Sequence, residues 1–253
     1  MINQFKQYSD CLVIAAKHMN KLKDVAAKKR EVIEGALKHY DMPMTDYSVL
    51  YVGFNPAILV CESSDVAVTS VGIDTYEWIA AEAKSDVKYV AYEDITENNS
   101  WDIVICAEEF FTFAKTDEEP INAIQKICSV ANELVISSVK DYKNLDYKDK
   151  EFSSPAVIRT GDEFLTFTEF HNWSLSDRNH IKSYIFVNGK VTDTFGPFNR
   201  RTLYFKQLAK FCFDSGASHF LVHKNLMYKS LIKKNYEHVV SVKFDDEHKQ
   251  RSK

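Results

Sequence analysis

Residues 49–58 read VLYVGFNPAI, a stretch in which an apolar run meets helix-starting residues. An apolar run typical of a buried strand stops at Gly53 and is followed by Asn55-Pro56. Asparagine is one of the best helix-capping residues, and proline is well tolerated at the first helical position, where its missing N–H would be unpaired anyway. We therefore expect a strand, a turn at Gly53 and a helix from Pro56. A loop with a single glycine offers few backbone amides to a phosphate, which disfavours a dinucleotide.

The same change from strand to helix recurs along the middle of the chain. Short β-branched or aromatic runs predict strands at residues 48–53, 66–74, 87–93, 101–107 and 133–139. Segments of helical pattern lie between them at residues 56–63, 75–84 and 118–132. Strands joined by helical crossovers predict an α/β fold with three layers, built on a doubly wound, mainly parallel sheet.

The region before the first strand has a helical pattern of its own. Apolar residues recur every three or four positions from Phe5 to Leu37, and Asp41-Met42-Pro43 ends this pattern. Basic residues occupy the other face, which is either solvated surface or a docking surface for a partner; they are Lys17, Lys21, Lys23, Lys28, Lys29 and Arg30. We predict an N-terminal helical extension over residues 1–43, a main domain over 44–246 and a polar tail over 247–253.

The C-terminal third has a period of two. Residues 163–170 and 181–191 alternate apolar and polar side chains, which predicts antiparallel strands with one wetter face. Turn signals stand at Asn188-Gly189 and Gly196-Pro197. A helix capped by Asn199 and stopped near Gly216 follows, and then two last strands over 218–224 and 237–244. We interpret residues 140–155 as an exposed loop, and 223–234 as a basic-aromatic segment that is either a surface loop or a nucleic-acid contact.

Composition narrows the class of protein. With 253 residues, 45% hydrophobic and 27% charged, the chain resembles an ordinary globular protein. A net charge of −4 gives no basic field of the kind that drives non-specific binding to nucleic acid. Five cysteines stand singly without zinc-type spacing, so we expect reduced thiols and no metal site. No signal peptide or spanning segment fits, so we expect a soluble cytoplasmic protein.

The residues that follow the strands resemble a known family. In an open parallel sheet the ligand site lies beyond the carboxyl ends of the strands. After the second predicted strand, V-T-S-V-G-I-D-T and an Ala- and Glu-rich helix place Asp74 21 residues beyond Gly53. This run resembles the second-strand signature of class I S-adenosylmethionine-dependent methyltransferases, and Gly53 takes the position of the first glycine of that family's glycine-rich loop. The resemblance covers residues 47 to about 140, including Glu93-Asp94 after VKYVAY and the acidic loop after WDIVICA.

The resemblance implies a cofactor, S-adenosylmethionine, and roles for five residues. Gly53 and Asn55 would contact its methionine part, Asp74 the ribose and Asp94 the adenine. Glu108 would lie at the mouth where donor meets acceptor and is one catalytic candidate. The other is His171, which lies outside the resembling region and follows a predicted strand, where it could cap a pocket for a planar substrate. The methyl acceptor would be an unidentified small molecule or nucleic acid. Class I enzymes end in an antiparallel hairpin, which the resemblance assigns to residues 163–170 and 181–191.

Each of these residues also has a structural interpretation. Asp74 is a helix cap, Asp94 belongs to a solvated turn, Glu108 is an exposed acid and His171 is a structural residue. Two functions stay open. The chain is either a methyltransferase or, because its glycine-rich loop is reduced to Gly53, a methyltransferase-like scaffold that has lost its chemistry and serves as a binding or assembly module. A nicotinamide-dependent reductase is a third, weaker alternative.

Overall fold

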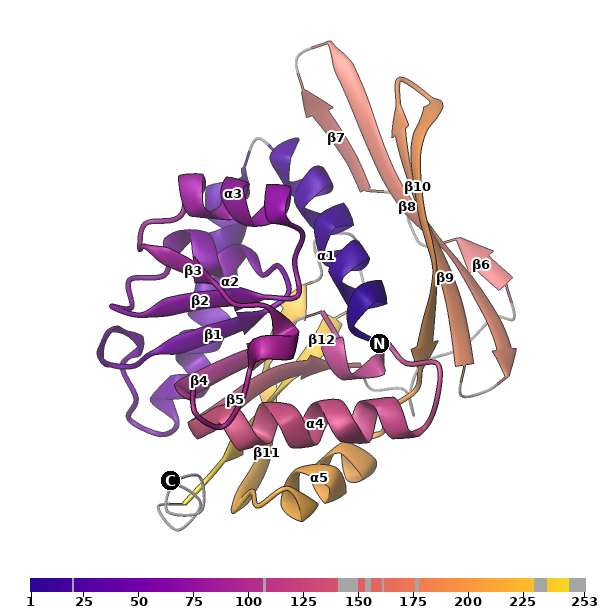
Figure 1. The fold of residues 1–253 in the computed structure, drawn as a ribbon. Coiled ribbons are helices and arrows are strands. Elements are labelled where there is room, and N and C mark those ends of the chain that lie inside the picture. The colour runs from indigo at the N-terminus through magenta and orange to yellow at the C-terminus, as the bar shows by residue number, and fades with distance from the viewer. Residues whose placement is uncertain are drawn as a thin grey trace.

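The computed structural model describes residues 1–19, 21–106, 108–140, 150–152, 156–160, 162–175, 178–229 and 236–245. Seven described strands form one sheet in the order β11-β12-β5-β4-β1-β2-β3 (Figure 1). Their bounds are β1 Val49–Val52, β2 Val66–Thr69, β3 Val87–Tyr89, β4 Trp101–Cys106, β5 Ala131–Val139, β11 His219–Lys229 and β12 Tyr236–Lys243. Strands β1 to β5 are parallel, while β12 is antiparallel to both β5 and β11. The predicted α/β fold with a mainly parallel sheet is therefore confirmed.

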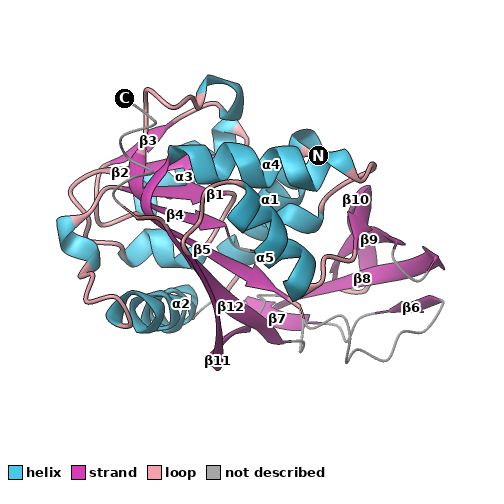
Figure 2. Cartoon of the chain, turned by 90° about the horizontal axis from the view of Figure 1, so that it is seen from below, coloured by secondary structure: helices cyan, strands magenta, loops and turns pink. Residues whose placement is uncertain are grey.

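The central strands are covered by helices on both faces. Every residue of β1 and β2 is buried, as expected for parallel strands inside a three-layer fold. Figure 2 shows α2 on one side of the sheet and α4 with α5 on the other. The helices are α1 Ile2–Lys17, α2 Leu22–Lys38, α3 Ile73–Glu82, α4 Glu118–Val130 and α5 Phe205–Asp214. The strand order reverses between β1 and β4, where ligand sites of such sheets form.

The N-terminal region is two helices, and both belong to the core. In α1, eight of 16 residues are buried, because its apolar stripe packs between the main sheet and a second sheet (Figure 1). The expected basic face is only partly exposed. Lys29 is 4% exposed, and Arg30 is half-buried against Glu34 and Glu62. None of the described helices is long and apolar enough to cross a membrane.

The loop after β1 forms as expected but makes a shorter helix. The side-chain oxygen of Asn55 accepts a hydrogen bond from the Ala57 N–H at 2.9 Å, and Pro56 occupies the first helical position. The helix that follows is a single 3-10 segment, η2 Pro56–Val60, rather than a helix over 56–63. Helix α2 packs against it.

The assignment of the C-terminal hairpin was wrong. Residues 163–170 and 181–191 lie in a separate antiparallel sheet with strand order β10-β9-β8-β6, in which β7 also pairs with β8. Its strands are β6 Lys150–Phe152, β7 Ala156–Thr160, β8 Glu163–Leu175, β9 Arg178–Val187 and β10 Lys190–Arg201. The hairpin of the main sheet is β11 and β12, the pair expected at 218–224 and 237–244. Alternation with period two predicted strands correctly, but it does not specify the sheet to which they belong.

Of the turns and helix ends predicted in the C-terminal third, some are confirmed and some are wrong. The turn at Asn188-Gly189 is confirmed, with φ of 49° and 79°. Gly196-Pro197 lies inside β10, and Asn199 does too, so the helix cap is Tyr204 with Gln207 instead. The helix ends at Asp214, just before Gly216, as expected.

The predicted surface segments lie partly in strands. Residues 150–152 of the expected loop over 140–155 are strand β6, and Lys140 is buried. Residues 223–229 of the basic-aromatic segment are strand β11 rather than a loop. The rest of these two segments, 141–149, 153–155 and 230–235, lies outside the described residues, as does the tail over 247–253.

Candidate functional site

The ends of the first two strands lie side by side. Val52 of β1 pairs with Thr69 of β2, and the Gly53 N–H donates a hydrogen bond to the Thr69 carbonyl at 2.8 Å. Gly53 has a φ of +76°, a conformation that L side chains rarely adopt. The chain therefore turns at Gly53 as the sequence predicts, at the edge of the sheet where a ligand site is expected.

Helix α1 occupies the space above Gly53. A Cβ atom built on Gly53 would lie 2.3 Å from Cε1 of Phe5 and 2.8 Å from Oγ of Ser9. The Phe5 ring is 1% exposed and meets the rings of Phe110 and Phe113 edge-on, at centroid distances of 4.8 and 5.1 Å. The Phe5 ring of the same chain thus lies so close to Gly53 that only a glycine fits at this position.

The end of β2 is covered by the same helix. The Asp10 carboxylate accepts a hydrogen bond from the Gly72 N–H at 2.7 Å, and a Cβ on Gly72 would lie 2.7 Å from the other carboxylate oxygen. Gly72 is the cap residue of α3, so a negative charge here also favours the N-terminus of that helix. The acidic group at this strand end therefore comes from α1, and it is bonded to the backbone.

The described residues at these strand ends are closely packed. Phe54, Asn55, Thr69 and Ser70 are 0 to 3% exposed. With Phe5 on Gly53, these described residues do not fit S-adenosylmethionine, the cofactor that the fold family implies, at the ends of β1 and β2. Four polar atoms are nevertheless buried there without a hydrogen-bond partner in the described part of the chain: Ser9 Oγ, Asn55 Nδ2, Thr69 Oγ1 and Ser70 Oγ.

The predicted cofactor residues are not all brought together. Asn55 is buried beside Gly53, but its side-chain oxygen caps η2. Asp74 is exposed in the first turn of α3, because β2 already ends at Thr69, five residues earlier. Asp94 is exposed in the short helix η3 Tyr92–Asp94 that follows β3. Neither aspartate is at the sealed strand ends.

Glu108 and its neighbour Glu109 form a buried ionic cluster beyond β4. Both glutamates have left-handed backbones, with φ of 54° and 58°. Lys29 of α2 lies 3.4 Å from a Glu108 carboxylate oxygen. The Glu109 carboxylate lies 2.6 Å from the Lys140 ammonium and 2.5 Å from the Arg200 guanidinium of β10. The interpretation of Glu108 as an exposed acid is therefore wrong, since its side chain is 2% exposed and paired with a lysine.

The placement of Lys29 on the basic face was wrong. Lys29 lies on the buried side of α2, three residues after Ala26 and four before Ile33, and this helical spacing was the one signal that could have predicted its burial. The pairing of Glu109 with Arg200 had no such signal, because the two residues are 91 positions apart, with Glu109 in the loop after β4 and Arg200 on β10 of the second sheet.

His171 lies on strand β8 of the second sheet. Its Nε2 atom lies 3.3 Å from a carboxylate oxygen of Glu169, which is completely buried on the same strand. The two catalytic candidates thus face different partners, Lys29 and Glu169.

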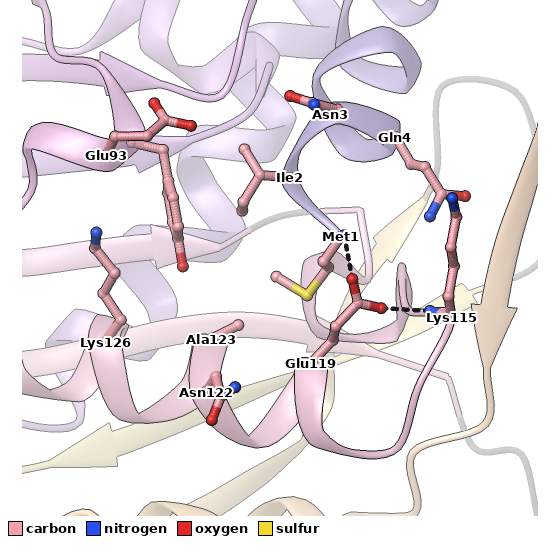
Figure 3. A pocket seen from close by; sticks show the side chains of 11 residues that line it. Met1, Ile2, Asn3, Gln4, Glu93, Lys115, Glu119, Asn122, Ala123 and Lys126 are labelled. Atoms are coloured by element: carbon pink, nitrogen blue, oxygen red, sulfur yellow. Dashed lines mark hydrogen bonds and ion pairs between the residues drawn. The ribbon is translucent and has the colours of Figure 1, made fainter.

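A cavity of about 500 Å³ lies outside the sealed region, between the first residues of α1, Tyr92-Glu93 and α4 (Figure 3). The Met1 amine and the Lys115 N–H both meet the Glu119 carboxylate, and the Lys126 ammonium lies 4.6 Å from the centre of the Tyr92 ring. Burial raises the pKa of Tyr92 well above its usual value. The described lining residues include none of the predicted cofactor residues. No group of three or more possible metal ligands occurs among the residues that the structure describes.

Comparison with known proteins identifies the fold. No family model and no curated protein matches the chain. Among solved structures, an S-adenosylmethionine-dependent methyltransferase from Clostridium acetobutylicum matches with a TM-score of 0.61 and 10% identity, over 86% of this chain and 91% of that one. The chain has the fold of class I S-adenosylmethionine-dependent methyltransferases.

Two further solved structures of this fold agree over similar lengths. DesVI of Streptomyces venezuelae matches with a TM-score of 0.60 and 13% identity, over 87% of this chain and 92% of that one. The sugar N-methyltransferase KedS8 from a Streptoalloteichus species matches with a TM-score of 0.63 and 11% identity, over 87% and 88%. At 10 to 13% identity, the similarity to these methyltransferases shows a shared fold and does not show a shared activity.

Proposed function

We propose that this chain is a methyltransferase-like binding or assembly module that does not take S-adenosylmethionine at the ends of β1 and β2. One observation carries this proposal: the Phe5 ring lies where the close approach to Gly53 would otherwise serve a ligand, 2.3 Å from a Cβ built on that glycine. The exposed positions of Asp74 and Asp94 and the pairing of Glu108 with Lys29 support it.

Moving α1 out of the core would cost a free energy similar in size to the binding free energy of a cofactor. Phe5, Tyr8, Leu12 and Val13 are each 1% exposed, and burial of such side chains is worth about 1.5–3 kcal/mol each, or about 6–12 kcal/mol together. A ligand with micromolar affinity contributes about 8 kcal/mol. Binding that first displaced α1 would therefore lose most or all of its favourable free energy.

The test is calorimetric titration of the full chain with S-adenosylmethionine and S-adenosylhomocysteine up to millimolar concentration. We expect no saturable heat. A one-to-one isotherm that the Asp74→Ala substitution abolishes would overturn the proposal, because Asp74 would then be a cofactor contact. Asp86→Ala is a matched control, since Asp86 is also an exposed aspartate, at the other end of the α3 crossover.

A second candidate function is an active methyltransferase in which α1 moves aside to admit the cofactor. The four unpaired polar atoms of Ser9, Asn55, Thr69 and Ser70 favour it, because each buried unsatisfied group costs about 1–3 kcal/mol that a polar ligand would recover. In this case Gly53, Asn55, Asp74 and Asp94 would contact S-adenosylmethionine, and Glu108 and His171 would lie on the acceptor side. The acceptor would be a small molecule or nucleic acid. Transfer of radiolabelled methyl groups to any acceptor, lost in Asp74→Ala, would select this candidate.

A partner of the assembly module would not meet the apolar stripe of α1, because eight of the 16 residues of this helix are buried. The exposed lysines of the N-terminal region belong mainly to α2 and the turn before it, among them Lys21, Lys23 and Lys28. These side chains are the part of the region that is available to a protein partner.

A further inference from the structure

The second sheet has one buried face and one uncovered face. Phe167, Ile181, Ile185 and Phe198 are 0 to 1% exposed, and Phe198 packs on Tyr8 of α1 with ring centroids 5.5 Å apart. On the opposite side, which we call the outer face, large apolar side chains are exposed: Phe152 64%, Val157 61%, Val191 53% and Phe164 48%. In the part of the chain that the structure describes, no helix or strand lies over this side of the sheet (Figures 1 and 2).

Strand register gathers these side chains into one surface. Directly paired residues of an antiparallel sheet point to the same face, and the outer-face pairs are Phe152–Phe170, Val157–Thr166, Thr166–Phe186 and Phe186–Val191. The Phe152 ring lies 4.9 Å from that of Phe170 and 6.4 Å from that of Tyr184, which in turn lies 6.4 Å from Phe186. The exposed groups are thus contiguous, unlike single exposed apolar residues, which are common on soluble proteins.

The outer face has the size of a protein interface. Ten residue pairs join β8 and β9. Ten residues at about 3.4 Å each give a length of about 34 Å, and four strands at about 4.8 Å of width each give about 19 Å. The face therefore measures about 650 Å². A stable complex of standard size buries about 800 Å² on each partner. Two such faces together would bury about 1,300 Å², above the about 1,000 Å² that a specific interface should reach.

We propose that two copies of this chain associate through the outer face. The side chains of this face that the structure describes are aromatic, valine and threonine, and the Arg159 guanidinium lies over the Phe164 ring at 5.5 Å. By register Lys182, opposite Phe170, also belongs to this face. Such a surface needs a partner that is also apolar, flat and twisted like a sheet. A second copy supplies that surface through a twofold axis, with the two sheets about 10 Å apart and their side chains interdigitated. The inference is independent of the proposed function, because the sealed strand ends lie on the other side of α1.

The test is the molar mass of the full chain by light scattering during gel filtration at micromolar concentration. We expect about twice the 29.2 kDa of one chain. Phe164→Lys and Val157→Lys each place a charge in the interface and should weaken association at least about tenfold. The matched controls are Phe213→Lys and Ile73→Lys, whose side chains are 48% and 59% exposed on α5 and α3, away from the sheet. These controls should leave the mass unchanged.

Two results would overturn the proposal: a wild-type monomer, or a dimer that persists in both outer-face variants. Thermal melting of each variant shows whether it is folded. Phe164→Lys and Val157→Lys are measured as separate single variants, so that if one of them fails to fold the other still tests the proposal. If both unfold, hydrogen exchange of the wild-type β8 and β9 amides at two protein concentrations replaces them. Protection that rises with concentration supports association through this face, and constant protection contradicts it.

Discussion

Replacement of Gly53 by alanine tests whether this glycine is required by the protein's own packing. The new methyl group would lie 2.3 and 2.6 Å from two atoms of the Phe5 ring and 2.8 Å from Ser9 Oγ, all inside van der Waals contact. Overpacking of a buried site costs about 1–3 kcal/mol. The φ of +76° adds about 1 kcal/mol for a residue with a Cβ. We expect a loss of about 3 kcal/mol, measured by urea denaturation, and a melting temperature lower by about 6–12 °C.

The control for backbone strain is Gly189→Ala. Gly189 has nearly the same φ, +79°, but a Cβ there meets nothing within 4 Å, so only the conformational cost of about 1 kcal/mol is expected. Phe5→Ala should cost less in the Gly53→Ala background than in the wild-type protein, because the space left by the ring accepts the methyl group. This coupling should reach about 1–3 kcal/mol. If Gly53→Ala destabilised the protein no more than Gly189→Ala, the packing of Phe5 on Gly53 would be refuted.

Two other substitutions test the buried charges and the pH dependence. Lys29→Met leaves Glu108 buried without its lysine and should lower the free energy of unfolding by about 3–5 kcal/mol. The control is Lys28→Met, at an exposed neighbour, which should change this free energy by less than about 0.5 kcal/mol. Equal effects of the two substitutions would contradict the pairing of Lys29 with Glu108. Burial, and then the nearby His39, lower the pKa of His223. The unfolded chain therefore binds this proton at a higher pH than the folded chain, and stability should fall as the pH drops below about 6.5. His223→Gln should flatten that fall in denaturation measured from pH 7.5 to 5, and an unchanged slope would count against the effect.

The sequence predicted the parallel sheet well because burial on both faces leaves a clear pattern. The continuous apolar runs that became β1, β2, β4 and β5 could hardly form anything else. The strand ends were also identified correctly at Gly53, since a glycine after such a run indicates a turn or a close approach.

What the sequence did not specify was the group that makes this close approach. The amphipathic pattern of residues 5–37 predicts that one helix face is buried, but periodicity does not name the surface that covers it. Phe5 packs on Gly53, 48 residues further along the chain, and Asp10 bonds to Gly72, 62 residues further along. Only the folded chain brings these residues together. Asp74 was displaced from the expected site for a local reason, because β2 ends at Thr69 and the chain enters α3 before reaching it.

The claim that α1 seals the strand ends is tested most directly by hydrogen exchange of the α1 amides, with and without millimolar S-adenosylhomocysteine. Amides that are protected by packing exchange only when the helix opens, so the rates report displacement of α1. We predict the same slow exchange over Phe5 to Val13 in both conditions. Faster exchange in α1 together with new protection at Gly53 and Ser70 in the presence of the ligand would contradict the account.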